Sequence, residues 1–333
     1  MTITGKVRTK RDGSEFAAIL GREEFMNELN HLFPTREGHR GPDQVRFQVL
    51  RCHPNRCVFD LAMKLDKEWQ SVIVKLFTVD RPDVFSTLQR IYESGFGQGA
   101  EFVVPRPIAY LPSVKIFIEE KVEGKQAKAI LIAENQSEQV EAVERAGAWL
   151  AQFHTTAPKF GNRVGPEALL ESSRGWAGMV SEFGGAFPSK CKLLMDKLEA
   201  CLPEDGSLQY CPGHGNYIPS HVLFDDHHTT TIDLDGFELV DPALDVALFT
   251  ISVERFGLKY HRPANYFERL NELFLRSYLK RGRKEALNNL PFYKGAEYLH
   301  RARRDLYKTN PPAPSWAETM LDHAIRGLLN ENR

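Results

Sequence analysis

Three polar positions, far apart in the chain, follow one another in an order that suits group transfer. Lys75 is a lone charge inside the apolar run V-I-V-K-L-F, Asn216 belongs to a loop that begins His-Gly-Asn, and Asp233 ends a short strand-like run. A cation can neutralise nucleotide phosphates, a loop residue can orient an attacking hydroxyl, and a carboxylate can hold the magnesium ion that bridges phosphate oxygens. The ordered set therefore points to phosphoryl transfer.

Strand signals surround Lys75. Apolar, β-branched runs at 45–52, 57–65 and 71–77 are separated by polar turns, which predicts an antiparallel meander. Proline near a first helical turn predicts a helix after Asp80, followed by an extended segment at 103–110 and another strand at 115–124. The first ~120 residues are thus expected to form a mostly antiparallel sheet with one crossing helix.

Helical signals dominate after Gly124. Apolar residues at helical spacing predict a helix over Gln136–His154, and the loop with Asn216 lies between helices. Asp241-Pro242 has the form of a helix start, with a capping carboxylate and proline in the first position. The remainder reads as helical, with a proline-rich break at 310–316.

Three motifs in the second half of the chain occur in the order of a known family. H-G-N-Y-I-P-S-H-V-L at 214–223, I-D-L-D at 232–235 and V-D-P-A-L-D-V-A at 240–247 resemble H-G-D-x-x-x-x-N-V-L, I-D-x-[DE] and G-D-P-x-x-D-[LI]-A of the aminoglycoside phosphotransferase and choline kinase superfamily. The resemblance covers roughly residues 45–250. It implies an α+β, two-lobed, protein-kinase-like fold, with a nucleotide-binding lobe at 1–122 and a catalytic and acceptor-binding lobe at 123–333.

The resemblance also implies roles for single residues. Lys75 would bind phosphates, and the backbone at Glu120 and Val122 would meet the purine of ATP or GTP. Asn216 and His214 would form the catalytic loop, with His214 expected to hold the loop by hydrogen bonds. Asp233, His221 and Asp235 would hold Mg²⁺, with Asp235 on the same side as Asp233 if the chain there is extended. Asp241 and Asp245 would brace the loop.

Four departures from the family pattern affect the expected chemistry. Asn216 replaces the catalytic aspartate, and an amide cannot take the proton although its oxygen can still accept a hydrogen bond. His221 replaces a metal-binding asparagine, whereas magnesium prefers oxygen ligands. The turn R-C-H-P-N-R-C is not glycine-rich, and the helix after Lys75 offers no clear glutamate partner for the lysine, with Asp83 and Glu93 only nearby.

These departures leave alternatives open beside a small-molecule kinase. One is a pseudokinase that binds nucleotide to gate a partner without phosphotransfer. Another is a metal-dependent hydrolase with His214, His221, Asp233 and Asp235 as zinc or manganese ligands. From Glu254 to Lys308 the chain has 14 Lys and Arg against 6 Asp and Glu, and a basic acceptor pocket would suit a neutral or anionic, sugar-like metabolite.

Composition excludes several other classes. Across 333 residues, 43 basic side chains nearly cancel 44 acidic ones, which argues against nucleic acid as a partner. No apolar run approaches the length of a membrane span, and the basic head 1–13 is followed by no signal-peptide core, so it is expected to be a solvated tail. The 5 cysteines include no C-x-x-C pair, which predicts free thiols and a cytoplasmic protein.

Overall fold

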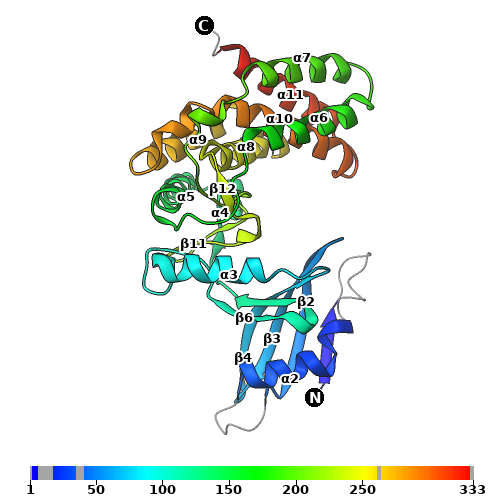
Figure 1. Ribbon diagram of the computed structural model, residues 1–333, viewed down its shortest axis with the longest axis vertical. Coiled ribbons are helices and arrows are strands. Elements are labelled where there is room, and N and C mark those ends of the chain that lie inside the picture. Colours follow the sequence, from blue (N-terminus) through cyan, green and yellow to red (C-terminus); the bar gives the residue numbers. More distant parts are fainter. Residues whose placement is uncertain (1, 7–17, 35–40, 261–263, 331–333) are drawn as a thin grey trace. The chain divides into compact units, whose positions relative to one another are not determined.

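The chain divides into two compact units, Met1–Glu123 and Gly124–Arg333. The computed structural model describes residues 2–6, 18–34, 41–260 and 264–330. Figure 1 labels many of the helices and strands of both units. The first unit is built on a sheet and the second is mainly helical, which confirms the predicted α+β class.

The sheet of the first unit has the order β1-β2-β3-β4-β7-β6 (Figure 1). Its strands are β1 (Thr2–Lys6), β2 (Gln44–His53), β3 (Arg56–Leu65), β4 (Glu68–Phe77), β6 (Pro107–Leu111) and β7 (Ile116–Glu120). β1 pairs with β2 in parallel, and the other neighbours are antiparallel. The expectation of a solvated head is thus wrong for residues 2–6, while residues 7–13 lie outside the described part of the chain.

Side-chain alternation gives this sheet two different faces. Every second residue of β3 is buried, and β4 contributes Val74 and Leu76 to the same apolar face. Helix α2 (Glu23–Leu32) covers that face with Phe25 and Leu29. The intervening residues of β4 and β7, among them Lys75, therefore point to the other side of the sheet.

The remaining elements of the first unit are short. Helix α3 spans Pro82–Ile91, with proline in its first turn as predicted, and a π-helical turn follows at Tyr92–Phe96. Phe85 of α3 packs edge-on against Phe117 of β7. β5 (Phe102–Val103) and a 3₁₀ turn at Pro112–Val114 complete the unit.

The second unit contains a helical bundle. Its helices are α4 (Ala127–Ile132), α5 (Gln136–Thr156), α6 (Pro166–Ser181), α7 (Phe187–Ala200), α8 (Ala243–Lys259), α9 (Ala264–Leu279), α10 (Leu290–Tyr307) and α11 (Pro314–Asn330). α5 packs on α9, and α10 packs on α6, α8 and α11 (Figure 1). One large apolar core joins α6, α7, α8, α10 and α11.

Two predicted helix starts have identifiable local causes. α5 begins at the predicted Gln136, because the Asn135 side chain accepts hydrogen bonds from the amides of Ser137 and Glu138. α8 begins at Ala243, one residue after the predicted Pro242. The Asp241 carboxylate still caps it by accepting the Ala243 amide at 2.8 Å.

Short strands between α7 and α8 carry the polar motifs. β9 (Cys211–Gly213) pairs with β12 (Glu238–Val240), and β10 (Val222–Phe224) pairs with β11 (Thr229–Thr231) and with β8 (Lys125–Gln126). Short 3₁₀ turns lie at Asp205–Ser207, Leu234–Gly236 and Lys284–Leu287. The loop 214–221 therefore connects β9 to β10, and each of these strands is paired with other strands of the second unit.

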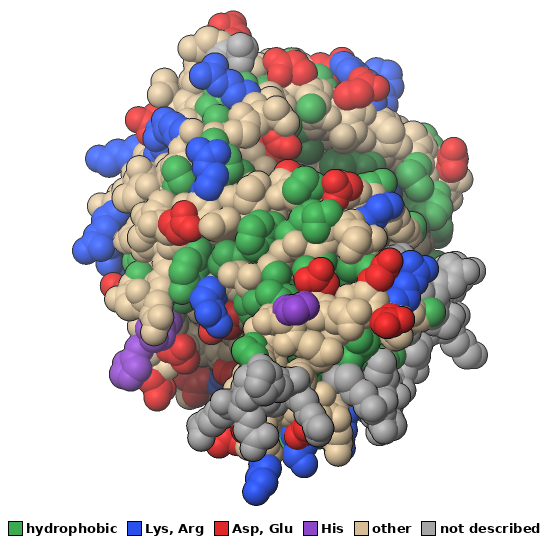
Figure 2. Space-filling model, turned by 60° about the horizontal axis from the view of Figure 1, so that its bottom comes forward, with side chains coloured by type: hydrophobic (Ala, Val, Ile, Leu, Met, Phe, Trp, Pro, Cys, Tyr) green, Lys and Arg blue, Asp and Glu red, His purple; other side chains and the backbone are tan. Residues whose placement is uncertain are grey.

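The surface is of mixed charge. Acidic, basic and apolar side chains are interspersed on the face in Figure 2, in keeping with the near-zero net charge. Within the described ranges, no helix is both long and apolar enough to span a bilayer.

Candidate active site

Lys75 lies in the first unit with a partner that the sequence did not suggest. Its Nζ is 3.0 Å from Oε1 of Glu119, and both side chains are about 95% buried. Lys75 lies opposite Phe117 in the β4–β7 register, so Glu119 is its diagonal neighbour on the same sheet face. A strand residue is therefore the partner of Lys75, and Asp83, one of the two nearby candidates after Lys75, binds Arg81.

The strand end at Glu120 was predicted to meet the purine. β7 ends at Glu120, whose amide donates to the carbonyl of Arg106 at 2.9 Å. The Glu120 amide is therefore already engaged and does not donate to a purine edge in this arrangement. Val122 follows the strand in irregular, half-buried backbone, where an amide is not committed to a strand ladder.

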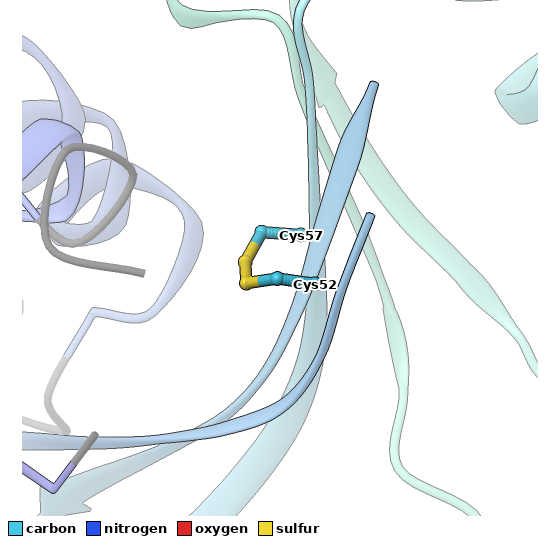
Figure 3. The surroundings of a disulfide bond; sticks show 2 residues. All are labelled: Cys52 and Cys57. Carbon is cyan, nitrogen blue, oxygen red and sulfur yellow. A yellow bond between two sulfur atoms is a disulfide. The ribbon is translucent and has the colours of Figure 1, made fainter. Parts of the chain in front are cut away.

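The turn between β2 and β3 is closed by a disulfide, which corrects the expectation that every cysteine is a thiol. Cys52 and Cys57 lie directly opposite each other in the hairpin register, with their Cα atoms 4.1 Å apart (Figure 3). Cys191, Cys201 and Cys211 are not disulfide-bonded, in agreement with the predicted thiols. The sequence signal was the five-residue separation across a turn, which places two cysteines at matching positions of a hairpin.

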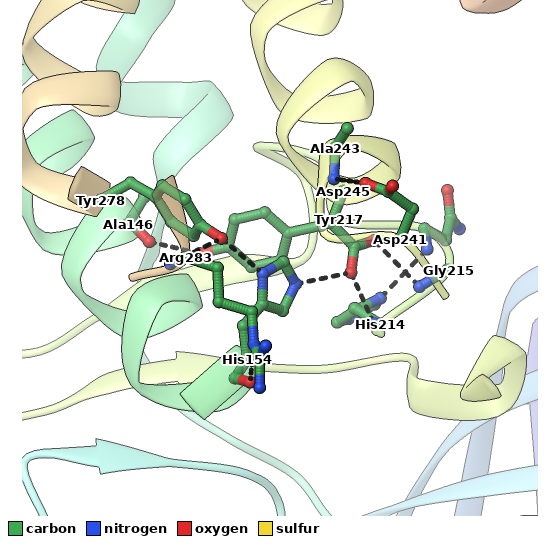
Figure 4. Close-up of polar contacts among 11 residues, drawn as sticks. Ala146, His154, His214, Gly215, Tyr217, Asp241, Ala243, Asp245, Tyr278 and Arg283 are labelled. Atoms are coloured by element: carbon green, nitrogen blue, oxygen red, sulfur yellow. Dashed lines mark hydrogen bonds and ion pairs between the residues drawn. The ribbon is translucent and has the colours of Figure 1, made fainter. Parts of the chain in front are cut away.

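In the second unit, the Asp245 carboxylate holds the loop that contains Asn216. Its Oδ2 accepts the amide of His214 at 2.7 Å and its Oδ1 accepts the amide of Gly215 at 3.0 Å (Figure 4). Burial alone would raise the pKa of Asp245. The hydrogen bond and charge of His154, with the loop amide, outweigh burial and lower that pKa below its usual range.

Asp245 is held in turn by a buried histidine and a tyrosine. His154 Nε2 lies 3.2 Å from Asp245 Oδ2, and His154 Nδ1 lies 2.9 Å from the hydroxyl of Tyr278 (Figure 4). Arg283 donates from Nε to the His154 carbonyl at 3.1 Å. His154, near the end of α5, is thus part of a chain of contacts, Tyr278–His154–Asp245, that ends on the loop backbone.

His214 fixes the loop from inside. Its Nδ1 accepts the Asn216 amide at 3.3 Å, so its Nε2 carries the proton and donates to the Ile232 carbonyl at 3.0 Å. Desolvation lowers the pKa of His214, because the buried ring favours the neutral form. Both ring nitrogens are thus engaged within the unit, in agreement with the expected holding role.

Gly215 is required by its conformation and by its neighbour. Its φ is +73°, and a Cβ atom there would lie 2.2 Å from the carbonyl oxygen of Gly236. The loop and the turn after Asp233 therefore touch backbone to backbone. No other residue type fits this contact without moving one of the two segments.

A column of stacked aromatic rings from α5, α8 and α9 packs against Tyr217 of the loop. Tyr217 stacks on Trp149 of α5 and on Phe249 of α8, and its hydroxyl donates to the Ala146 carbonyl at 2.8 Å. Phe249 stacks in turn on Phe274 of α9. Stacked rings contribute roughly 0.5–1.5 kcal/mol per pair beyond their buried area, so the column gives the loop a rigid base.

His221 and Asp233 come together beside Asn216. His221 Nδ1 lies 3.0 Å from the Asn216 carbonyl, and His221 Nε2 lies 3.5 Å from Asp233 Oδ2. Asp233 has a left-handed backbone, with φ of 67° and ψ of 51°. A left-handed backbone costs roughly 1–2 kcal/mol for a residue that has a Cβ atom. This cost suggests that the direction of the Asp233 side chain is important.

Asp235 was expected to bind metal beside Asp233 on the condition that the chain between them is extended. Because Asp233 is left-handed and Leu234–Gly236 forms a 3₁₀ turn, the chain is not extended here. The extended-chain argument for placing residues 233 and 235 on the same side therefore does not apply, and a metal-binding role of Asp235 stays a prediction.

The polar residues around Asp233 fit Mg²⁺ only in part. The Asp233 carboxylate is the oxygen donor that Mg²⁺ prefers, whereas the neighbouring His221 offers a nitrogen. Among the described residues no group of three or more His, Cys, Asp or Glu is arranged to hold a metal ion. This gives no support to a four-ligand hydrolase site, and a cation at Asp233 would need further ligands from a bound nucleotide or water.

Comparisons with known proteins agree with the resemblance of the motifs. The model of a family described as "Phosphotransferase enzyme family" matches residues 66–287. Among curated proteins, none matches this chain.

Solved structures share the fold at low identity. A choline/ethanolamine kinase family protein from Mesorhizobium loti is 14% identical with a TM-score of 0.56, and the match covers 92% of this chain and 94% of that one. A putative aminoglycoside phosphotransferase from Ralstonia eutropha is 15% identical (TM-score 0.63; 92% and 98% covered), and a spectinomycin phosphotransferase in complex with ADP and spectinomycin is 13% identical (TM-score 0.59; 92% and 97% covered). The kinase-like fold is thereby confirmed.

Proposed function

Because this chain belongs to the phosphotransferase enzyme family, whose model covers most of it, we propose that it transfers the γ-phosphate of ATP or GTP to a hydroxyl of a small molecule. The observation that carries the proposal is the braced loop 214–221. Asp245 binds the backbone at its start, and His221 and Asp233 meet beside Asn216. Phosphoryl transfer depends mainly on positioning and electrostatics, which such a rigid polar loop supplies.

Each polar residue has a distinct part in this proposal. Lys75, held by Glu119, neutralises nucleotide phosphates, and the backbone at Glu120 and Val122 binds the purine. Asn216 orients the acceptor hydroxyl through its amide oxygen, which can accept a hydrogen bond. Asp233 holds a divalent cation, which would neutralise charge on the phosphates when bound.

Asn216 sets a limit on the rate of this reaction. A carboxylate in its place would take the proton of the acceptor hydroxyl, and such general-base catalysis typically contributes 10²–10⁴-fold. An amide provides only the hydrogen bond. We therefore expect slow turnover with ordinary nucleotide binding.

The acceptor is expected to be a neutral or anionic, sugar-like metabolite. Several basic residues of α8 and α10 form ion pairs: Arg255 with Asp305, Lys294 with Glu254, and Arg301 with Glu297. Burial, with the like charges of Arg301 and Arg304, lowers the pKa of Arg255 to about 10. Arg301 and Arg304 thus act on Arg255 as like charges, and an acceptor pocket formed here would disfavour a polycationic acceptor.

Nucleotide titration followed by calorimetry tests the proposal. The protein should bind ATP or GTP in the presence of a divalent cation, and Asp233→Asn should weaken that binding. Asp196→Asn is the matched control, since Asp196 only forms an exposed pair with Lys192. Absence of any nucleotide binding by the unmodified protein would remove the basis of the proposal.

A second function is favoured by one observation, the amide at position 216. A protein that binds nucleotide to gate a partner needs the braced loop but not the base. The two functions differ in one measurement: a kinase releases phosphorylated acceptor from a panel of metabolites, and a pseudokinase only binds nucleotide.

A further inference from the structure

The donor set beside Asn216 contains a nitrogen as well as an oxygen. His221 is 7% exposed, and its ring is oriented by the Asn216 carbonyl, 3.0 Å from Nδ1. A carbonyl oxygen can only accept, so Nδ1 must carry the proton. In the neutral ring the lone pair is therefore on Nε2, the atom that faces Asp233.

The distance between the two donors suits a shared ion. His221 Nε2 and Asp233 Oδ2 are 3.5 Å apart. Two ligands of one metal ion, each about 2.0–2.2 Å from it, can be separated by this distance. Without an ion or a proton between them, a lone pair and a carboxylate oxygen that face each other repel.

The local backbone holds both donors in place. The His221 amide donates to the Ile218 carbonyl, and the His221 carbonyl accepts the Ile232 amide, both at 2.9 Å. Asp233 follows Ile232 directly, in its left-handed conformation. The imidazole and the carboxylate thus come from two segments that are hydrogen-bonded to each other, which is the preorganisation that a metal site requires.

We infer that His221 Nε2 and Asp233 Oδ2 bind the same divalent cation, and that the site therefore takes Mn²⁺ in preference to Mg²⁺. Mg²⁺ prefers oxygen ligands and gives up water reluctantly. First-row transition ions accept imidazole, and Mn²⁺ also takes carboxylate and phosphate oxygens. The inference rests on the proposed function, because the remaining ligands are expected from nucleotide phosphates and water.

Electron spin echo spectroscopy of the full-length protein with Mn²⁺ and ADP tests the inference without any turnover. We expect nuclear modulation from a directly bound imidazole ¹⁴N. Protein labelled with ¹⁵N-histidine should show the corresponding ¹⁵N pattern, which excludes adenine nitrogen as its source. This labelled sample needs no substitution, so the result does not depend on the folding of a variant.

Two variants make the assignment specific. His221→Asn should lose the histidine modulation and keep bound Mn²⁺, and its affinity for Mn²⁺ relative to Mg²⁺ should fall by about 10-fold, the lower end of effects near metal sites. His228→Asn is the control, because His228 lies in the β10–β11 turn against Asp225; it should keep the modulation.

The possible failures are distinguishable. If the unmodified protein binds Mn²⁺–ADP without histidine modulation, the inference is overturned and the proposed function stays intact. His221 would then be paired with Asp233 as an imidazolium. Modulation that persists in His221→Asn would also overturn it. If neither Mn²⁺–ADP nor Mg²⁺–ADP binds at all, both the inference and the proposed function fail.

Discussion

Asp245 is the residue on which the geometry of the loop most depends. A fully buried carboxylate accepts two loop amides and lies against His154, so its charge is stabilised by these partners in place of water. Removing the charge leaves donors inside the unit without an anionic acceptor. Such a loss from a buried charged network costs far more than one at an exposed pair.

Asp245→Asn should therefore lower the free energy of unfolding by about 3 kcal/mol or more, the range for breaking a buried charged pair. Urea denaturation measures the change. Asp196→Asn, at an exposed pair on α7, should stay within about 0.5 kcal/mol. Equal effects of the two substitutions would show that the Asp245 network contributes nothing special.

Lys75 and Glu119 allow stability and nucleotide binding to be separated. Lys75→Met leaves the Glu119 carboxylate buried without its lysine and should cost about 3–5 kcal/mol of stability. The double variant Lys75→Met/Glu119→Met should regain most of that stability, because two apolar side chains replace the pair. Calorimetry should still find weakened nucleotide binding in the double variant; unchanged affinity would contradict a phosphate-binding role for Lys75.

At this scale the sequence predicted residue types better than partners. Lys75, Asp245 and the loop at 214–221 could be singled out because they are polar residues in apolar or patterned surroundings. Glu119 was missed, although it is the one charge at a buried position of β7 and alternation places it on the face of Lys75. Tyr278 carried no signal, since its contact with His154 depends on how α9 packs against α5.

At the scale of elements, the conformation of the loop 214–221 depends on a contact between two backbone segments. Gly215→Ala would place a Cβ atom 2.2 Å from the Gly236 carbonyl oxygen in a left-handed conformation. The conformation alone costs about 1–2 kcal/mol, so the total loss of stability should exceed that. Thermal unfolding and urea denaturation of Gly215→Ala and the unmodified protein each measure this loss of stability.

Gly175→Ala is the matched control for that substitution. Gly175 is an exposed residue of α6, and a Cβ atom added there would come within 4 Å of no described atom beyond its chain neighbours and its own helix backbone. Alanine should therefore stabilise the helix by about 0.5–1 kcal/mol. Stabilisation by Gly215→Ala as well would mean that the loop and the turn after Asp233 are not in contact.

The elements themselves followed from local signals where those were strong. Apolar, β-branched runs between polar turns located β3 and β4, the helical spacing of apolar residues located the start of α5, and the Asp241-Pro242 signal located the start of α8 to within a residue. β1 was missed because its five residues are paired by hydrogen bonds to a distant strand, which no local pattern encodes. The turn at 234–236 was missed because the left-handed Asp233 has no sequence signature.

At the scale of the whole molecule, acid should destabilise the fold near neutral pH. The folded-state pKa of His214 is lowered by burial, whereas the unfolded chain titrates near 6.5. Below about pH 6.5 the unfolded state binds more protons, so stability falls as pH falls, by up to about 1.4 kcal/mol per pH unit for each such histidine. Above that pH the contribution is complete.

Urea denaturation at pH 7.5 and 5.5 measures this dependence, because most carboxylates remain ionised over that interval. His214→Gln should reduce the loss of stability between the two pH values. His227→Gln, at an exposed turn residue, should leave it as in the unmodified protein. An unchanged pH dependence in His214→Gln would contradict the buried neutral histidine.

The fold as a whole could be predicted because the motifs of the second unit occur in the same order as in a known family. Proteins that share such an ordered set of motifs usually share the fold. The acceptor could not be predicted, because the sequence count of 14 basic against 6 acidic residues does not show which charges are paired, such as Arg255 with Asp305 and Lys294 with Glu254. Charge patterning along a helix predicts neither its partners nor its pocket.

The most direct test of the whole account is the turnover of Asn216→Asp. With a suitable acceptor from a metabolite panel, phosphotransfer should rise by at least about 10²-fold, the lower end of the general-base range. Nucleotide affinity should change little, because residue 216 is assigned to the acceptor hydroxyl and Lys75 and Asp233 to the phosphates and their cation. Turnover that stays at background in Asn216→Asp, with nucleotide bound and acceptor present, would contradict the phosphotransferase account.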